Sequence, residues 1–167
     1  YIRMFDSDAG TADYLSWNDT APTSTVFTVG DYRPNNGAWG DSYVAYCWHS
    51  VDGYSKMGSY EGNGNADGTF VYTGFRPAFV LIKAHTTSEP WSIRDSVRSP
   101  YNLANLVLKP DNSAVELTTG FSVDLLSNGF KCKQGGAEIN DSSHSYIYMA
   151  FAESPFVTSG GTPNNAR

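Results

Sequence analysis

GSYEGNGNADGTFVYTGFRPAFVLIK, residues 58–83, is the stretch around which the rest of the chain can be interpreted. Its first half is polar and rich in glycine, and its second half holds two short apolar segments at 69–72 and 78–82. Short apolar segments that contain aromatic and β-branched residues and are bounded by Gly, Pro and Asn are typical of β-strands. We therefore predict a polar loop that leads into two strands and joins two parts of a β-protein.

The composition favours an all-β protein with few charges. The 167 residues include 11 Tyr, 9 Phe, 4 Trp and 16 Gly, while charged residues make up only 17%. The formal net charge is −6 and Lys and Arg do not cluster, which argues against a nucleic-acid partner. No apolar run approaches the roughly 20 residues that a membrane-spanning helix requires, so membrane insertion is not expected. Because the chain begins with Tyr1, we expect it to belong to a longer or processed polypeptide.

Further strands are predicted from short apolar or alternating segments. Asn128 and Gly129 separate two such segments, 121–127 and 130–133, and form the strongest hairpin signal in the chain. Residues 99–109 fit either a helix that begins at Ser99 and Pro100 or a strand over 105–109, and composition favours the strand. The other predicted strands are 1–5, 26–29, 43–48, 91–94 and 146–152. The two cysteines, Cys47 and Cys132, lie in apolar segments and are interpreted as buried hydrophobic residues rather than a disulfide.

Two of these segments recur as an internal repeat. Phe27 aligns with Phe130 and Tyr43 with Tyr146, both 103 residues apart and with no gap between them. The side chains expected to face the core then match in type between the two copies. They are Val44, Tyr46 and Trp48 in the first copy and Ile147, Met149 and Phe151 in the second.

The predicted fold is an all-β sandwich with jelly-roll-like connections, built from two related β-units. The predicted parts are a partial first unit at 1–57, a complete second unit at 58–156, and a C-terminal tail at 157–167.

The glycine-rich loop has one feature of a metal site. Asn63, Asn65 and Asp67 offer oxygen atoms at alternate positions, as at the start of an EF-hand loop, but Gly74 stands where the closing Glu is required. A polar turn is therefore favoured, and Ca²⁺ is the alternative. The three histidines are far apart, and no pair of carboxylates or nucleophile–base pair is singled out by its context. We predict no catalytic residue, no metal site and no cofactor.

Aromatic residues in polar loops are the better candidates for ligand binding. Sugar rings stack on aromatic faces while Asn and Asp side chains bind their hydroxyl groups. Trp39 lies in a loop rich in Asn and Gly, and Tyr54, Trp91 and Tyr101 lie in or beside turns. The alternative is that such residues pack in the core or an interface, and we favour it for Trp48 and Trp91. The predicted ligand-binding residues are Tyr32, Asn36, Trp39, Asn63, Asn65 and Asp67.

The amino-acid sequences of several segments resemble those of a known domain. Residues 42–83 read SYVAYCWHSVDGYSKMGSYEGNGNADGTFVYTGFRPAFVLIK, and the further segments are WSIRDS at 91–96, LLSNGFK at 125–131, YIYMAFAESPF at 146–156 and NAR at 165–167. Together they resemble a domain that recurs in virion proteins of marine tailed bacteriophages, at the C-terminal end of tail-fibre-like proteins. The resemblance implies a place on the virion surface and a role in host attachment, and it carries over no catalytic or binding residue.

From the aromatic loops and this resemblance, we expect a non-enzymatic tail-fibre or receptor-binding domain that contacts a host receptor such as a surface glycan. It would act beside other virion proteins as a homo-oligomer, and fibre proteins suggest a trimer. Two alternatives remain open. One is a structural module, such as a capsid decoration or fibre-capping protein, and the other is a virion-associated enzyme that degrades glycans.

Overall fold

The computed structural model describes residues 6–11, 14–31, 36 and 42–156 of the chain. Among these, residues 10–47 form one compact unit, and residues 6–9 together with 48–156 form a larger one. Each unit is described by itself below. The predicted strand at 1–5 and the predicted tail at 157–167 lie outside the described residues.

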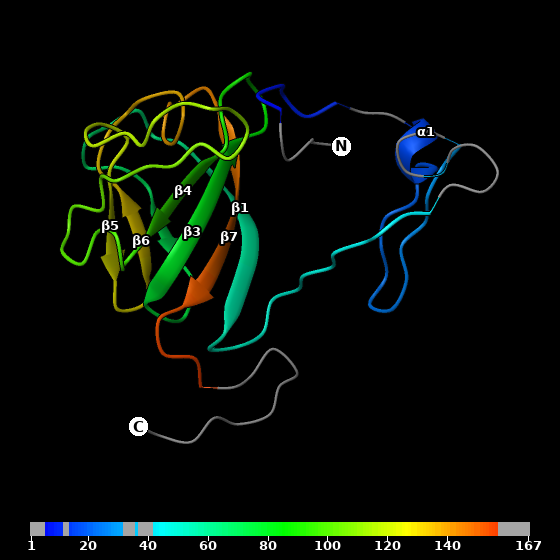
Figure 1. The fold of residues 1–167 in the computed structure, drawn as a ribbon, viewed down its shortest axis with the longest axis horizontal. Helices are drawn as coiled ribbons and strands as arrows, with labels where there is room; N and C mark the ends of the chain where they lie inside the picture. Colours follow the sequence, from blue (N-terminus) through cyan, green and yellow to red (C-terminus); the bar gives the residue numbers. More distant parts are fainter. Residues whose placement is uncertain (1–5, 12–13, 32–35, 37–41, 157–167) are drawn as a thin grey trace. The chain divides into compact units, whose positions relative to one another are not determined.

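The larger unit is an all-β sandwich of two antiparallel sheets, as the composition predicts (Figure 1). One sheet has the strand order β1-β7-β3-β4 and the other β2-β6-β5. The strands are β1 Ser55–Glu61, β2 Phe70–Tyr72, β3 Pro77–Ala84, β4 Ser92–Asp95, β5 Val123–Leu126, β6 Gly129–Cys132 and β7 Ser145–Ala152. The first strand pairs with the last and the second with the sixth, which agrees with the expected jelly-roll-like connections.

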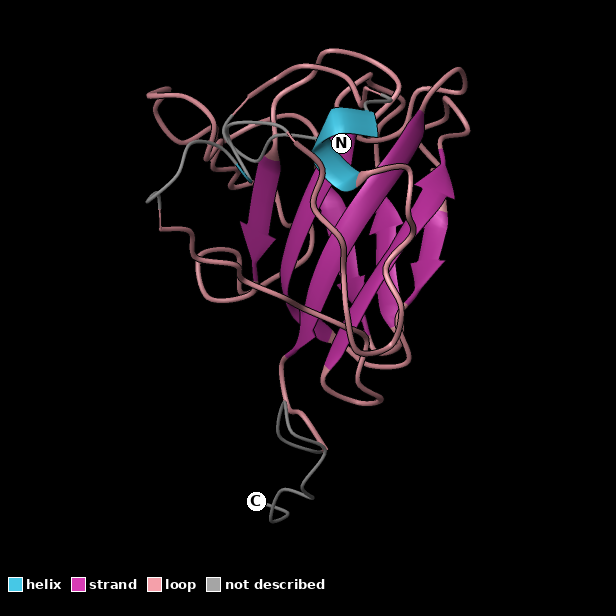
Figure 2. Cartoon of the chain, turned by 90° about the vertical axis from the view of Figure 1, so that its right-hand side faces the viewer, coloured by secondary structure: helices cyan, strands magenta, loops and turns pink. Residues whose placement is uncertain are grey.

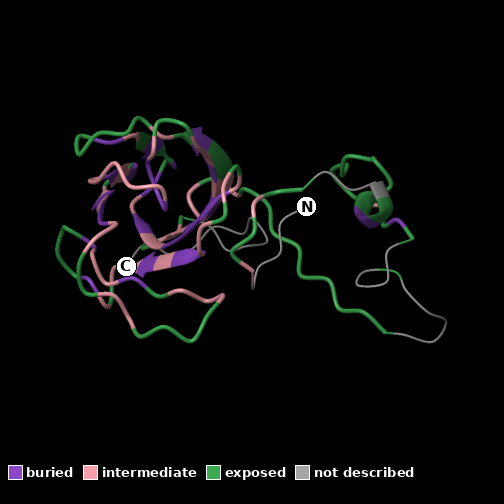
Figure 3. Cartoon of the chain, turned by 90° about the horizontal axis from the view of Figure 1, so that it is seen from above, coloured by how far each residue is buried: buried purple, intermediate pink, exposed green. Residues whose placement is uncertain are grey.

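Tyrosine rings form much of the core between the two sheets. The rings of Tyr60 and Tyr146 stack with their centroids 5.0 Å apart, and Phe130 from the opposite sheet meets Tyr148 edge to face at 5.4 Å. The Tyr60 hydroxyl donates a hydrogen bond to the carbonyl of Ile139 at 2.7 Å, so its polar end is satisfied although the ring is buried. Figure 3 shows the buried residues concentrated in the strands. The core also includes Val71, Phe75, Val80, Ile82, Ala84, Ala104, Val123, Leu125, Cys132, Ile139 and Ala150.

The face of β7 that enters the core differs from the sequence prediction. Tyr146, Tyr148 and Ala150 are the buried residues, whereas the expected core residues Ile147, Met149 and Phe151 are only half-buried and belong to the opposite face of the strand. Both faces of this segment are largely apolar, so alternation alone cannot choose between them. Tyr146 can take the core side because its hydroxyl donates a hydrogen bond to the carbonyl of Ala137 at 2.7 Å.

The strands predicted at 26–29 and 43–48 are wrong, because neither segment carries a strand in the structure. Val44 and Tyr46 are 77% and 75% exposed, although they were expected in the core. The sequence repeat is therefore not matched by a repeat of secondary structure. In this sheet β7 pairs with both β1 and β3. The first copy of the repeat therefore cannot take the same central place, because β7 already occupies it.

The smaller unit contains the short helix α1, Tyr14–Trp17, which is coloured cyan in Figure 2. The ring of Trp17 meets that of Phe27 edge to face at 6.3 Å, and Gly30 donates its N–H to the carbonyl of Ser16 at 2.9 Å. These contacts close residues 14–30 into a local turn of chain. No helix in the described parts of the chain is long and apolar enough to cross a membrane.

Candidate functional site

The glycine-rich loop at 62–69 is held in place by a buried asparagine from the other end of the chain. Asn140 is fully buried, and its side-chain oxygen accepts hydrogen bonds from the backbone N–H of Asn63 at 3.1 Å and of Thr69 at 3.3 Å. Its side-chain nitrogen donates to the side-chain oxygen of Asn63 and to the carbonyl of Asn65, both at 2.9 Å. One amide thus uses its full hydrogen-bonding capacity to fix the loop.

Two glycines allow the loop to approach the segment 134–141 closely. A Cβ atom on Gly62 would lie 2.1 Å from the carbonyl oxygen of Asp141, and one on Gly135 would lie 2.2 Å from that of Gly64. Any side chain at these positions would push the two backbones apart. Close packing therefore explains Gly62 in the opening stretch and Gly135 in the segment that it faces.

The loop residues Asn63, Asn65 and Asp67 turn their polar atoms toward protein partners. The side-chain oxygen of Asn63 also accepts the N–H of Asn65 at 3.0 Å, and its nitrogen donates to the carbonyl of Asp67 at 3.1 Å. The Asp67 carboxylate pairs with Lys131, and this hydrogen bond lowers the pKa of Asp67. These bonds make a self-contained polar turn, as favoured from the sequence. Among the described residues, no group of three His, Cys, Asp or Glu side chains could hold a metal ion.

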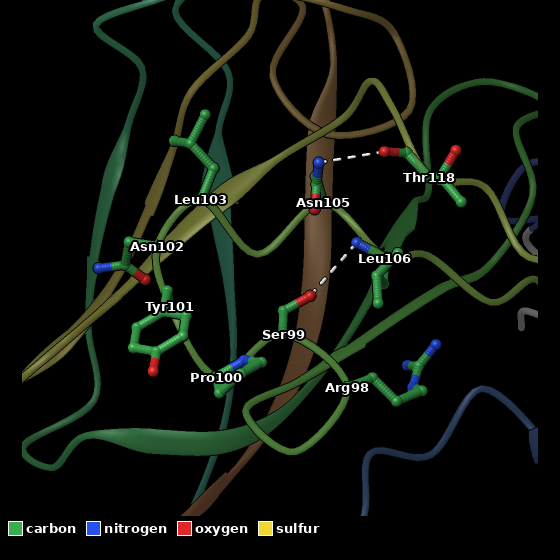
Figure 4. Close-up of a pocket in the computed structure, with 9 residues that line it drawn as sticks. All are labelled: Arg98, Ser99, Pro100, Tyr101, Asn102, Leu103, Asn105, Leu106 and Thr118. Atoms are coloured by element: carbon green, nitrogen blue, oxygen red, sulfur yellow. Dashed lines mark hydrogen bonds between the residues drawn. The ribbon is translucent and has the colours of Figure 1, made fainter.

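A separate surface hollow lies over the segment 98–106 and beside Thr118 (Figure 4). It is open rather than enclosed and has a volume of about 370 Å³, within the range of small-molecule sites. Figure 4 shows Pro100 and Tyr101 together at one end of the hollow and Asn105 and Thr118 at the other. Its lining residues are Arg98, Ser99, Pro100, Tyr101, Asn102, Leu103, Asn105, Leu106 and Thr118.

The segment that lines the hollow is neither the helix nor the continuous strand considered from the sequence. It follows the outer edge of β5, where Ala104 forms an isolated bridge with Val123. Two residues earlier, the Asn102 side chain takes the place of a strand backbone, because it accepts the N–H of Leu125 at 2.9 Å and donates to the carbonyl of Leu125 at 3.3 Å. The edge of β5 is thereby closed, and the chain beside it is fixed in position.

Two hydrogen bonds across the hollow shape its floor. The side-chain nitrogen of Asn105 donates to the carbonyl of Thr118 at 3.1 Å, and the backbone N–H of Leu106 donates to the hydroxyl of Ser99 at 3.3 Å (Figure 4). Among the described residues, the side-chain oxygen of Asn105 and the Thr118 hydroxyl have no hydrogen-bond partner, so both remain available to a ligand.

The single cation of the lining is neutralised by two carboxylates. Arg98 pairs with Asp95 at 2.5 Å and with Glu116, and Asp95 also accepts the backbone N–H groups of Val97 and Arg98. Partial burial raises the pKa of Asp95, but the hydrogen bonds from Arg98 outweigh it and leave that pKa below its usual value. This corner of the hollow therefore carries one more negative charge than positive.

Tyr101 contributes the aromatic ring of the lining and is 83% exposed. Pro100 and Leu103 beside it are also exposed, so carbon surface is offered to solvent next to neutral hydrogen-bonding groups. Such a surface can stack on a flat, partly apolar ligand whose edges carry hydroxyl groups. The lining includes no carboxylate, histidine or cysteine.

Residues 1–155 match a family model that is described as "Domain of unknown function (DUF7483)". The chain belongs to the DUF7483 family. No curated protein and no solved structure matches it.

The structure of this DUF7483 chain distributes the predicted ligand-binding residues over different places. Tyr32 and Trp39 lie outside the described residues, and Asn36 is described and exposed. Asn63, Asn65 and Asp67 belong to the loop at 62–69, which contributes nothing to the lining of the hollow. The predicted set therefore does not form one site among the described residues.

Sequence reasoning also ranked the aromatic residues of the DUF7483 chain incompletely. Trp91 is buried, as expected, and Tyr54 packs edge to face on Phe151 at 6.2 Å. Trp48 was expected in the core but is half-exposed. The sequence predicts for Tyr101 only a place in or beside a turn. Its neighbours Pro100 and Asn102 were the available signal, since Pro and Asn favour an exposed turn.

Proposed function

We propose that this chain is a non-enzymatic binding domain that holds a surface glycan in the hollow beside Tyr101. The observation that carries the proposal is an 83% exposed tyrosine ring at one end of an open hollow, with the uncommitted oxygen atoms of Asn105 and Thr118 at the other end. A pyranose ring has an apolar face that can stack on an aromatic ring, while its hydroxyl groups bind neutral polar atoms. The hollow offers both at once.

The proposal extends to a setting on the virion surface. The amino-acid sequence of residues 42–83 and of several segments downstream resembles tail-fibre-like virion proteins of marine phages. Attachment to a host glycan would suit such a protein. The chain would then work as a homo-oligomer, a trimer by analogy, beside other virion proteins. Light scattering of the purified protein measures the number of chains, and a monomer at all concentrations would contradict the trimer.

The experiment is a screen of the purified chain against an array of bacterial surface polysaccharides, followed by titration calorimetry on any glycan that binds. Tyr101→Ala should weaken binding about tenfold or more, because the stacking surface is lost. Tyr72→Ala is the matched control, since Tyr72 is 64% exposed on β2 and does not line the hollow. If no glycan binds, the proposal fails. If both variants bind as the wild type does, the site lies elsewhere.

Two rival functions make different predictions. A structural module would bind no glycan but would associate with other virion proteins. A glycan-degrading enzyme would release oligosaccharides from a bound polysaccharide over hours, and such release would overturn the non-enzymatic proposal. The lining favours binding because it contains none of the carboxylates that glycoside hydrolysis uses.

A further inference from the structure

The charged corner of the hollow bears on which glycans can bind there. Arg98 is the lining residue through which an acidic sugar would be recognised, because a guanidinium group pairs with carboxylate, sulfate or phosphate groups. Its Nε is 2.5 Å from Asp95, and one of its terminal nitrogens contacts Glu116. A second terminal nitrogen lies 3.5 Å from the carbonyl of Ile93. Each of the three guanidinium nitrogens therefore already has a protein acceptor, and two carboxylates offset its charge.

The remaining groups of the hollow are neutral. They are the carbon surfaces of Pro100, Tyr101 and Leu103 and the oxygen atoms of Asn105 and Thr118. A ligand with a net negative charge would approach a corner with two carboxylates and one cation, on a chain whose formal net charge is −6. Like charges a few ångströms apart cost about 1 kcal/mol even in water, which corresponds to about fivefold in affinity.

Resting on the glycan-binding function proposed above, we infer that this hollow selects neutral sugars and excludes acidic ones, with Glu116 and Asp95 as the residues that determine the exclusion. The two carboxylates act by occupying Arg98 and by repelling anions, and neither needs to touch the bound sugar. Because the attraction to a neutral sugar involves no net charge, its affinity should change little with salt.

The test compares neutral hexose oligosaccharides with uronic acid oligosaccharides of the same length in titrations at low and high salt. The wild type should bind the neutral series at least about fivefold more tightly at low salt, and the affinity for the neutral series should stay within about twofold at high salt. Binding of neither series would overturn the glycan-binding function itself. A preference for the acidic series would leave that function standing and would overturn only the selectivity.

The Glu116→Gln variant tests the effect of the Glu116 negative charge by itself. The amide keeps a hydrogen-bond acceptor for Arg98 but removes one negative charge, so the affinity for the uronic acid series should rise about threefold to fivefold while that for the neutral series stays unchanged. Glu153→Gln is the matched control, because Glu153 pairs with Arg76 at 2.8 Å and neither residue lines the hollow. Equal effects of the two variants would show that net charge alone is responsible and would overturn the role given to Glu116.

Discussion

Asn140 shows how much a single buried side chain contributes to this fold. Its amide makes four hydrogen bonds to the loop at 62–69, and it is fully buried. Asn140→Ala removes both halves of the amide and leaves part-buried N–H and C=O groups of the loop without this partner. We expect the free energy of unfolding to fall by about 3 kcal/mol, measured by urea denaturation.

The control for this variant lies in the same loop. Asn65→Ala removes an exposed side chain whose nitrogen donates to the carbonyl of Asn63 at 2.9 Å. The exposed partner can bind water instead, so the loss should stay below about 1 kcal/mol. Similar losses in the two variants would mean that Asn140 is not the centre of the loop.

Cys132 makes the stability depend on pH in the alkaline range. Burial raises the pKa of its thiol from the ordinary 9.0 to about 11. Below pH 9 the thiol is protonated in both the folded and the unfolded chain, so its contribution to stability is complete. Between pH 9 and 11 the unfolded chain loses this proton while the folded chain keeps it, so stability falls as the pH rises.

The expected loss from this thiol is about 2–3 kcal/mol across that range. It is measured as the difference in unfolding free energy between the wild type and Cys132→Ser, followed from pH 8 to pH 11. Serine does not titrate there and can still donate to the carbonyl of Ile139, which the thiol approaches at 3.5 Å. Groups that do not interact with Cys132 titrate alike in both proteins and cancel. Parallel curves for the two proteins would contradict the prediction.

At the scale of elements, the two copies of the sequence repeat provide a matched pair of tyrosines. Tyr146 in β7 is fully buried, and its hydroxyl donates to the carbonyl of Ala137 at 2.7 Å and accepts the N–H of Asp141 at 2.8 Å. Tyr43, at the aligned position, is 47% exposed and belongs to no strand. Tyr146→Phe should lower the unfolding free energy by about 1–3 kcal/mol, and Tyr43→Phe by less than about 0.5 kcal/mol. Equal costs would indicate that residues 43–48 are packed as β7 is.

The strands that sequence reasoning identified share a local signal. The predicted hairpin joins β5 and β6, with its turn at Ser127 and Asn128 and with Gly129 as the first residue of β6. The apolar segments at 69–72, 78–82 and 91–94 became β2, β3 and β4 with shifts of a few residues. β1 was missed because Gly58 and Ser59 resemble a loop, and only pairing with β7 makes this segment a strand. The segment 43–48 failed for the opposite reason, because its apolar pattern finds no paired strand in the described structure.

The hollow could not be derived from the sequence because its parts come together only in the folded chain. Asn105 and Thr118 are 13 residues apart and meet through the hydrogen bond from the Asn105 side chain. The ion pair of Arg98 with Glu116 also joins residues that are 18 positions apart. The closure of the loop at 62–69 likewise requires Asn140, 77 residues from Asn63. Such long-range pairs have no local pattern that reveals them.

At the scale of the whole molecule, the β-sandwich needs only part of the chain. All seven strands and the buried apolar core lie within residues 55–152. From the segment 6–9, one recorded contact is the carbonyl of Ser7, which accepts a hydrogen bond from the buried Lys83 at 2.7 Å. Lys83 also donates to the carbonyl of Glu89 at 2.6 Å, so it keeps a partner if Ser7 is removed.

A chain of residues 48–156 should therefore fold by itself. We expect a β-sheet circular dichroism spectrum and one cooperative unfolding transition, with a free energy of unfolding about 1–2 kcal/mol below that of the full chain because one bond to a buried charged group is lost. A chain of residues 48–144 is the control. It lacks β7, the strand between β1 and β3, and should not fold, because removing it breaks both pairings of that sheet and exposes the tyrosine core. If the 48–156 chain also fails to unfold cooperatively, then residues 1–47 are part of the folding unit, and the sandwich cannot be treated as an independent domain.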